Sequence, residues 1–196
     1  MHTIRRTFPV LLSLAGAVVA TATAERSHAD ALAVHAAAQV AAVNTTPTPL
    51  IDKVRVATER YRDINVAISE GWVQATPCVS GPDFGAMGVH FVQPGRLSDG
   101  ILKAEQPEAL IYEPLPNGAV RLVGVEFIVM ASIWAGQNPG GSPPALEGNL
   151  LNLVAAPNRF GLPAFYELHV WAWEHNPNGS FADWNAAVSC ERQPGT

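Results

Sequence analysis

Four short apolar runs in this chain each carry a histidine or a glutamate near their middle. The runs are 87–92, 109–113, 122–129 and 166–171, and the residues in question are His90, Glu113, Glu126 and His169. Runs of this length that are rich in β-branched and aromatic residues predict strands, and apolar flanks predict that the polar groups are buried. A buried carboxylate is costly unless it is paired or coordinated. Because His and Glu converge most commonly on a divalent metal ion, the pattern predicts a metal site with one ligand from each strand.

The ligand types restrict the metal without identifying it. Two imidazoles with one or two carboxylates suit Mn, Fe, Zn or Cu. An open coordination position would permit oxygen or Lewis-acid chemistry, so the sequence leaves a metalloenzyme and a metal-binding protein without turnover as alternatives. Glu167, two residues before His169, could replace either glutamate, and Tyr112 could hydrogen-bond to a ligand.

Strand alternation tests whether these residues can meet. His90 shares a face of its run with Gly88, and Glu126 shares one with Gly124, so a ligand or another backbone can approach closely at both places. The turn sequence at 116–118 lies between two of the runs and suits a tight hairpin, which allows their glutamates to face the same side of the sheet.

Two non-metal alternatives remain open. The histidines could be ordinary core residues, and Glu126 could pair with Arg121 or Arg159, as in a secreted interaction protein with structural ion pairs. Otherwise Trp171, Trp173 and the Gly/Pro/Asn-rich stretch at 135–163 could form an apolar pocket for a small-molecule ligand in a non-enzymatic binding module.

Several function classes are excluded by what the sequence lacks. The formal net charge is −5, with no cluster of Lys and Arg, so we expect no nucleic-acid partner. No zinc-protease helix, nucleophile elbow or phosphate-binding loop motif is present. A cupin would need a second histidine where Val92 stands.

The N-terminal segment predicts export. Arg5 and Arg6 precede a short apolar stretch at 8–20, and small residues up to Ala24 form a signal peptidase site, so we expect a signal peptide at 1–24. The stretch is too short for a membrane span, so the mature protein should have none and be periplasmic or secreted. The arginine pair fits the twin-arginine route as well as the general secretory route. Residues 25–48 read as an Ala-rich arm and linker.

The chain has two cysteines, Cys78 and Cys190. An oxidising compartment would join them in a disulfide that closes a long loop and ties the tail to the chain ahead of His90. The alternative is that Cys78 is a nucleophile beside a histidine.

Residues 49–196 are expected to form one α+β domain. Thr48 is a suitable N-cap, Pro49 suits the first helical position, and apolar residues at three-and-four spacing up to Ile68 predict one helix that ends at Gly71. From Trp72 onward the pattern is β. We therefore expect an N-terminal helix packed on a mainly antiparallel sheet, with barrel closure left undecided and one disulfide.

Several motifs together resemble those of a family of uncharacterised exported bacterial proteins. They are GAMGxHF at 85–91, PExLxYEP at 107–114, LVGVEF at 122–127, LHVWxW at 168–173 and NPNGxF at 176–181. The resemblance covers about residues 50–190 and implies export and a single domain, without a mechanism. Ala186 stands where the family pattern has a proline, a difference that concerns a turn.

Overall fold

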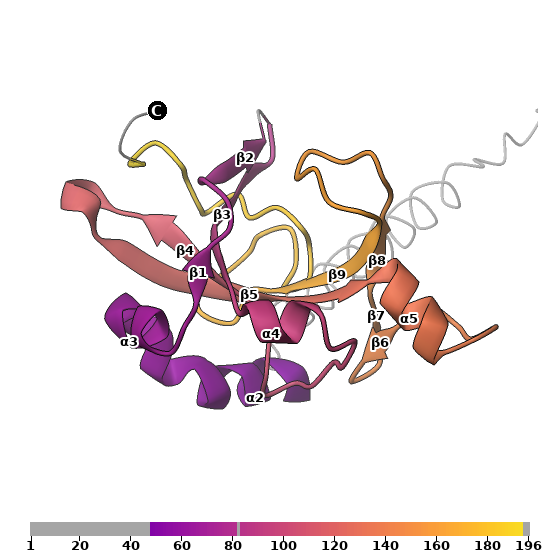
Figure 1. Cartoon of the computed structure of the whole chain (residues 1–196). Coiled ribbons are helices and arrows are strands. Elements are labelled where there is room, and N and C mark those ends of the chain that lie inside the picture. Colours follow the sequence, from indigo (N-terminus) through magenta and orange to yellow (C-terminus); the bar gives the residue numbers. More distant parts are fainter. Residues whose placement is uncertain (1–47, 82, 194–196) are drawn as a thin grey trace, which may run out of the picture. The chain divides into compact units, whose positions relative to one another are not determined.

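The computed structural model describes residues 48–81 and 83–193 (Figure 1). The expected signal peptide and nearly all of the expected arm lie outside these residues. The helices are α2 Pro49–Thr58, η1 Glu59–Arg62, α3 Ile64–Ser69, α4 Pro94–Leu97, η2 Pro116–Gly118 and α5 Ala131–Gln137. The strands are β1 Val73–Gln74, β2 Val79–Gly81, β3 Gly85–Val92, β4 Ala109–Pro114, β5 Val120–Met130, β6 Ala145–Leu146, β7 Asn149–Leu150, β8 Asn152–Val154 and β9 Phe165–Val170.

The N-terminal helix begins as expected but is interrupted. The hydroxyl of Thr48 accepts a hydrogen bond from the Ile51 amide, and Pro49 occupies the first turn. The prediction of one continuous helix is wrong, because the chain tightens into η1 and then restarts at Asp63. The Asp63 carboxylate accepts from the Asn65 amide and caps α3, as short acidic side chains commonly do. Gly71 follows with φ +84°, the left-handed conformation that ends many helices.

The antiparallel sheet is confirmed, and it is open. The strand order is β1-β3-β4-β5-β9-β8, with β2 paired to β3 and β6 paired to β7 in a separate hairpin. All these pairs are antiparallel, and the sheet does not close into a barrel. The β4–β5 hairpin turns through Asn117 and Gly118, both with positive φ. The 135–163 stretch is more structured than expected, since it contains the end of α5, the β6–β7 hairpin and β8.

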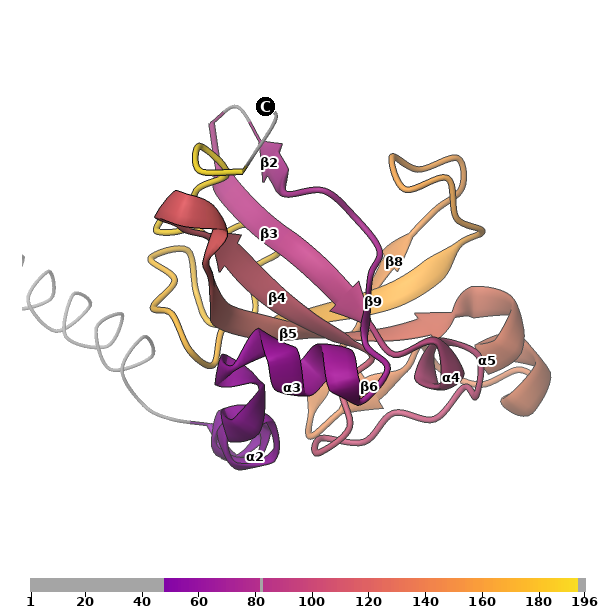
Figure 2. The ribbon, with the colours of Figure 1, turned by 60° about the vertical axis from the view of Figure 1, so that its left-hand side comes forward.

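The two faces of the sheet have different coverings. Figure 1 and Figure 2 show α2 and α3 on one face, and Figure 1 shows β2, the C-terminal segment and the β8–β9 loop on the other. The helices bury Leu50, Ile51 and Val54 against strand residues such as Leu110 and Phe127, and this forms the main hydrophobic core. Burial of this kind contributes roughly 1.5–3 kcal/mol per large side chain.

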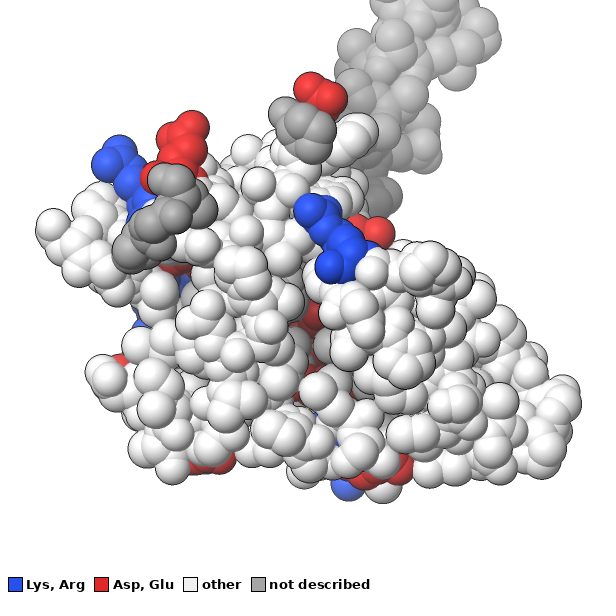
Figure 3. Space-filling view, turned by 45° about the horizontal axis from the view of Figure 1, so that its top comes forward, with Lys and Arg blue, Asp and Glu red and all other residues white. Residues whose placement is uncertain are grey.

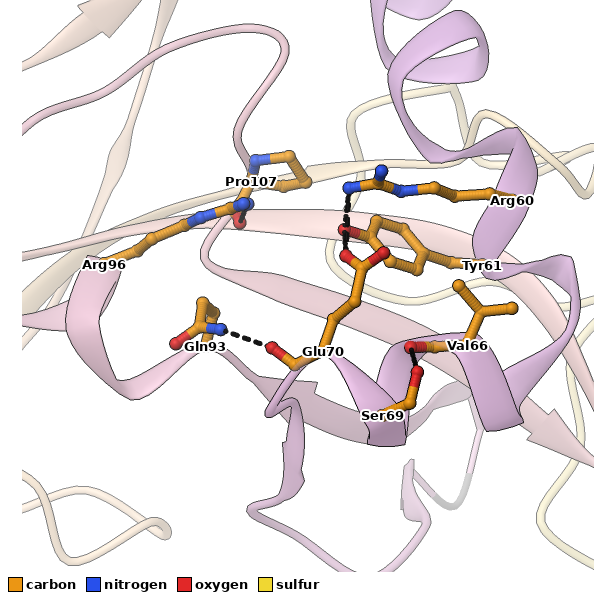
Figure 4. Close-up of polar contacts among 8 residues, drawn as sticks. All are labelled: Arg60, Tyr61, Val66, Ser69, Glu70, Gln93, Arg96 and Pro107. Atoms are coloured by element: carbon orange, nitrogen blue, oxygen red, sulfur yellow. Dashed lines mark hydrogen bonds and ion pairs between the residues drawn. The ribbon is translucent and has the colours of Figure 1, made fainter.

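Hydrogen bonds fix the helices to the loops at the sheet edge (Figure 4). The Tyr61 hydroxyl donates to Glu70 Oε2 at 2.7 Å, and Arg60 lies 2.9 Å from the same carboxylate oxygen. The Gln93 side chain donates to the Glu70 carbonyl, and Arg96 donates to the Pro107 carbonyl at 2.8 Å. These contacts hold the helical layer in place against its face of the sheet.

The covering of that opposite face depends on the C-terminal segment. The predicted disulfide joins Cys78 and Cys190 across a sequence separation of 112 residues. The indole N–H of Trp171 donates to the Ala182 carbonyl at 2.6 Å, and the backbones of Ala86 and Asn185 exchange two hydrogen bonds at 3.1 Å. The tail is therefore fastened over the sheet at three points.

Candidate metal centre

Strand register brings three of the four predicted ligands together. Glu126 on β5 lies directly opposite His169 on β9, and directly opposed residues share one face of an antiparallel pair. His90 lies two strands from Glu126, a separation of about 10 Å between backbones. Ala109 on β4 lies opposite Glu126, and its small side chain leaves space for the two longer groups to meet above it. His90 Nε2 is 3.3 Å from Glu126 Oε2.

The resulting triad has the spacing of a metal site. His90, Glu126 and His169 each present one ligand atom, and these three atoms lie within 4.8 Å of one another. All three residues are buried, with exposed fractions of 5%, 4% and 1%. Groups that are costly to bury have thus been placed together by backbone pairing, as the sequence pattern predicted.

His169 is the residue of the triad whose polar atoms have the fewest hydrogen-bond partners. Neither of its ring nitrogens has a hydrogen-bond partner within the described part of the chain. Its Nδ1 is 3.9 Å from Asp183 Oδ1, beyond hydrogen-bond distance. The ring stacks on Trp171 at 6.0 Å between centroids and contacts the edge of His90 at 5.9 Å. A buried imidazole with two unpaired nitrogens is unusual, because buried polar groups are nearly always bonded.

Burial keeps both imidazoles neutral, the form that coordinates metals. It lowers the pKa of His90 to about 4 and that of His169 to about 3, and the repulsion that two protonated rings would exert on each other adds to the lowering for His169. The Thr76 hydroxyl lies 3.3 Å from His90 Nδ1 and also accepts from the His90 amide. This hydroxyl orients the His90 ring so that its Nε2 faces Glu126, in the way that a metal-ligating histidine is commonly oriented by a bond at its other nitrogen.

Two more carboxylates border the triad. Glu167, Asp183 and His169 form a second group whose ligand atoms lie within 4.8 Å of one another. Burial raises the pKa of Glu126 well above its ordinary value, and the charge of Glu167 raises it further. Burial also raises the pKa values of Glu167 and Asp183. A divalent cation would stabilise the ionised forms of this acidic cluster, which otherwise repel one another.

Glu113, the fourth predicted ligand, lies elsewhere. It shares the sheet face of Glu126, but it is four residues beyond Ala109 on β4, or about 13 Å along the strand. Its carboxylate is 2.6 Å from Arg121 and accepts a hydrogen bond from the Ser189 amide. Tyr112 also faces away from the site, and its hydroxyl donates to the Tyr61 carbonyl on the helical side.

Asp183 is the neighbour that sequence reasoning missed. It lies in the irregular segment after β9, where no periodic pattern distinguishes one acidic residue from another. Its position is set by the bond from the Trp171 indole to the adjacent Ala182 carbonyl. The LHVWxW motif contains both His169 and Trp171. It is therefore the sequence signal that could have indicated that the segment with Asp183 lies beside His169.

A cavity of about 500 Å³ adjoins the triad and has His90 and Glu126 in its lining. Figure 3 views this side of the molecule and shows acidic atoms at the bottom of a narrow hollow. The lining has aromatic residues in Phe160 and Phe165, and it contains neither Trp171 nor Trp173. The two tryptophans pack in different apolar clusters, so the Trp-lined pocket considered above is not the cavity found.

Comparisons with protein-family models, with curated proteins and with solved structures found no match. The family resemblance given by the motifs therefore remains a prediction.

Proposed function

We propose that this protein binds a divalent transition-metal ion through His90, Glu126 and His169. The observation that carries the proposal is the buried His169 ring, whose two nitrogens have no partner in the described chain. It lies beside two further potential ligand atoms, and the three atoms are within 4.8 Å of one another. Two neutral imidazoles and one carboxylate suit Mn, Fe, Zn or Cu. Glu167 and Asp183 supply further negative charge beside the ion.

The chain would leave part of the coordination sphere open toward the cavity. Three protein ligands with an open position are typical of catalytic rather than structural metal sites. An ion held in this way supplies Lewis-acid chemistry to whatever molecule reaches it. The residues of the chain position the ion, keep the histidines neutral and exclude bulk water by burial.

The test is the metal content of the purified protein by mass spectrometry, as isolated and after incubation with each metal. We expect about one ion per chain, because a closely spaced ligand set binds stoichiometrically. His90→Ala, Glu126→Gln and His169→Ala should each lose it, whereas His175→Ala, which removes an exposed histidine, should not. Circular dichroism of each variant separates ligand loss from unfolding. A folded wild type that takes up no metal would overturn the proposal.

We also infer that the mature protein is exported after cleavage behind Ala24. The disulfide between Cys78 and Cys190 supports an oxidising compartment. Among the helices that the structure describes, none is long and apolar enough to cross a membrane. Intact-mass measurement of protein recovered from the exported fraction tests this inference, with Glu25 as the expected first residue.

A further inference from the structure

The cavity beside the proposed metal centre runs from solvent to the ligands. Arg159 and Leu162 in its lining are exposed, whereas His90 and Glu126 are buried. The exposed pair therefore marks its mouth and the buried pair its floor. At about 500 Å³ it lies within the size range of small-molecule sites.

The wall between mouth and floor is mainly apolar. Ile128, Phe160 and Phe165 contribute to it, and the two phenylalanine rings meet edge to face at 6.1 Å between centroids. Aromatic edges and faces of this kind accommodate a flat or branched apolar body. Among the described residues of the lining, Arg159 is the one lysine or arginine.

The mouth and the floor of the cavity carry different ionisable groups. The Arg159 guanidinium lies 5.5 Å over the Trp184 ring, and no carboxylate of the described chain forms an ion pair with it. At the floor, Glu126 is accompanied by Glu167 and Asp183. The guanidinium therefore makes the mouth the end of the cavity that attracts an anion.

We propose that the cavity binds a small organic monocarboxylate with an apolar body. The carboxylate pairs with Arg159, whose planar fork matches the geometry of that group, and a single arginine matches a single charge. The apolar body lies along Phe160 and Phe165. Its far end points to His90 and Glu126, and only the contact of that end with an ion rests on the proposed function.

The test uses 4-phenylbutyrate and 4-phenylbutylamine, which share an apolar body and differ in the sign of their charge. Each is titrated calorimetrically into metal-free and metal-loaded protein. We expect the carboxylate to bind both forms and the amine to bind more weakly. Arg159→Gln should weaken carboxylate binding by about 10- to 150-fold, the effect of one charged hydrogen-bonded pair.

Two further variants make the result specific to the cavity. Arg62→Gln removes an arginine that also lies over a tryptophan, Trp173, but on η1 at the helical side, and should leave binding unchanged. Leu162→Trp enlarges an exposed lining residue and should block binding without disturbing the core. Absence of carboxylate binding, equal binding to Arg159→Gln, or preference for the amine would overturn the inference. Metal content, measured on the same samples, reports separately on the proposed function.

Discussion

Glu126 and His169 face each other across β5 and β9, and backbone pairing alone sets their separation. Neither residue lies on a loop, so neither has to be ordered when a ligand binds. Such placement on rigid strands favours precise metal sites. It also forces two ionisable groups into a buried position, where burial lowers the pKa of one and raises that of the other.

His169→Leu should separate stability from metal binding. In metal-free protein we expect the variant to be more stable than the wild type by about 1–3 kcal/mol, because an unpaired buried ring is replaced by an apolar side chain. Metal binding should be lost at the same time. Urea denaturation in the presence of a chelator measures the first effect and metal content the second. A less stable metal-free variant would show that the ring nitrogens have partners after all.

The strands themselves were more predictable from the sequence than their register. The apolar runs around His90, Glu126 and His169 identified β3, β5 and β9 and their burial. Strict alternation along β5 would place Leu122, four residues before Glu126, on the face of Glu126, but it lies on the other face. A register shift between Ile111 and Tyr112 places Leu122 in the helix-side core.

The position of Glu113 along its strand also depends on register, so the sequence did not predict it. Alternation specifies the face of a residue but not its distance along a strand, and the hairpin register put Ala109 rather than Glu113 opposite Glu126. Glu167, considered as a substitute for either glutamate, does lie beside the triad. Asp183 depends on tertiary contacts of an irregular segment and left no local pattern.

Ala109→Val tests whether His90 and Glu126 can meet only because the side chain of Ala109 is small. Ala109 is fully buried opposite Glu126, and added methyl groups there should push the two ligands apart. We expect a 10- to 100-fold loss of metal affinity, about the effect of disturbing groups that orient ligands. Ala104→Val adds the same volume to the core on the helical side and should leave affinity unchanged. Competition with a chromogenic chelator measures both, and equal losses would contradict the model of the site.

Gly88→Ala should be strongly destabilising. Gly88 has φ +96°, and a Cβ there would lie 2.7 Å from the Tyr112 carbonyl oxygen. The room predicted beside His90 is thus occupied by the neighbouring backbone rather than by a ligand. We expect a loss of more than about 2 kcal/mol in the free energy of unfolding. Gly136→Ala, in α5 with open space around its Cβ position, should instead stabilise by about 0.5–1 kcal/mol. Thermal denaturation of both variants provides the comparison.

Replacing both Cys78 and Cys190 by serine should destabilise the fold and loosen the site. In the chain-entropy model, opening a loop of 112 residues costs about 4–5 kcal/mol. Cys78 lines the cavity two residues after Thr76, which orients His90, so metal affinity should fall as well. Urea denaturation and chelator competition measure the two effects. Unchanged affinity in a folded double variant would show that Thr76 is held in place without the bridge.

Glu108→Gln should show how pH acts on the core. Glu108 is fully buried, accepts a hydrogen bond from the Ile128 amide and leaves Oε1 unpartnered. Burial raises its pKa from 4.5 to about 8; the amide bond and the charge of Arg96 oppose the rise, and the charge of Asp99 adds to it. Between these pH values the folded protein holds a proton that the unfolded chain has released, so Glu108 makes the wild type less stable as pH rises.

The glutamine variant keeps an oxygen for the Ile128 amide and carries no titrating proton. Its stability should therefore match the wild type near pH 4.5 and exceed it increasingly up to about pH 8, by on the order of a few kcal/mol. Above that pH the difference should stay constant, because folded and unfolded chains are then both ionised. Glu105→Gln, an exposed neighbour, controls for loss of charge alone. Urea denaturation from pH 4.5 to 9 measures the difference, and a flat profile would mean that Glu108 is already ionised in the folded protein.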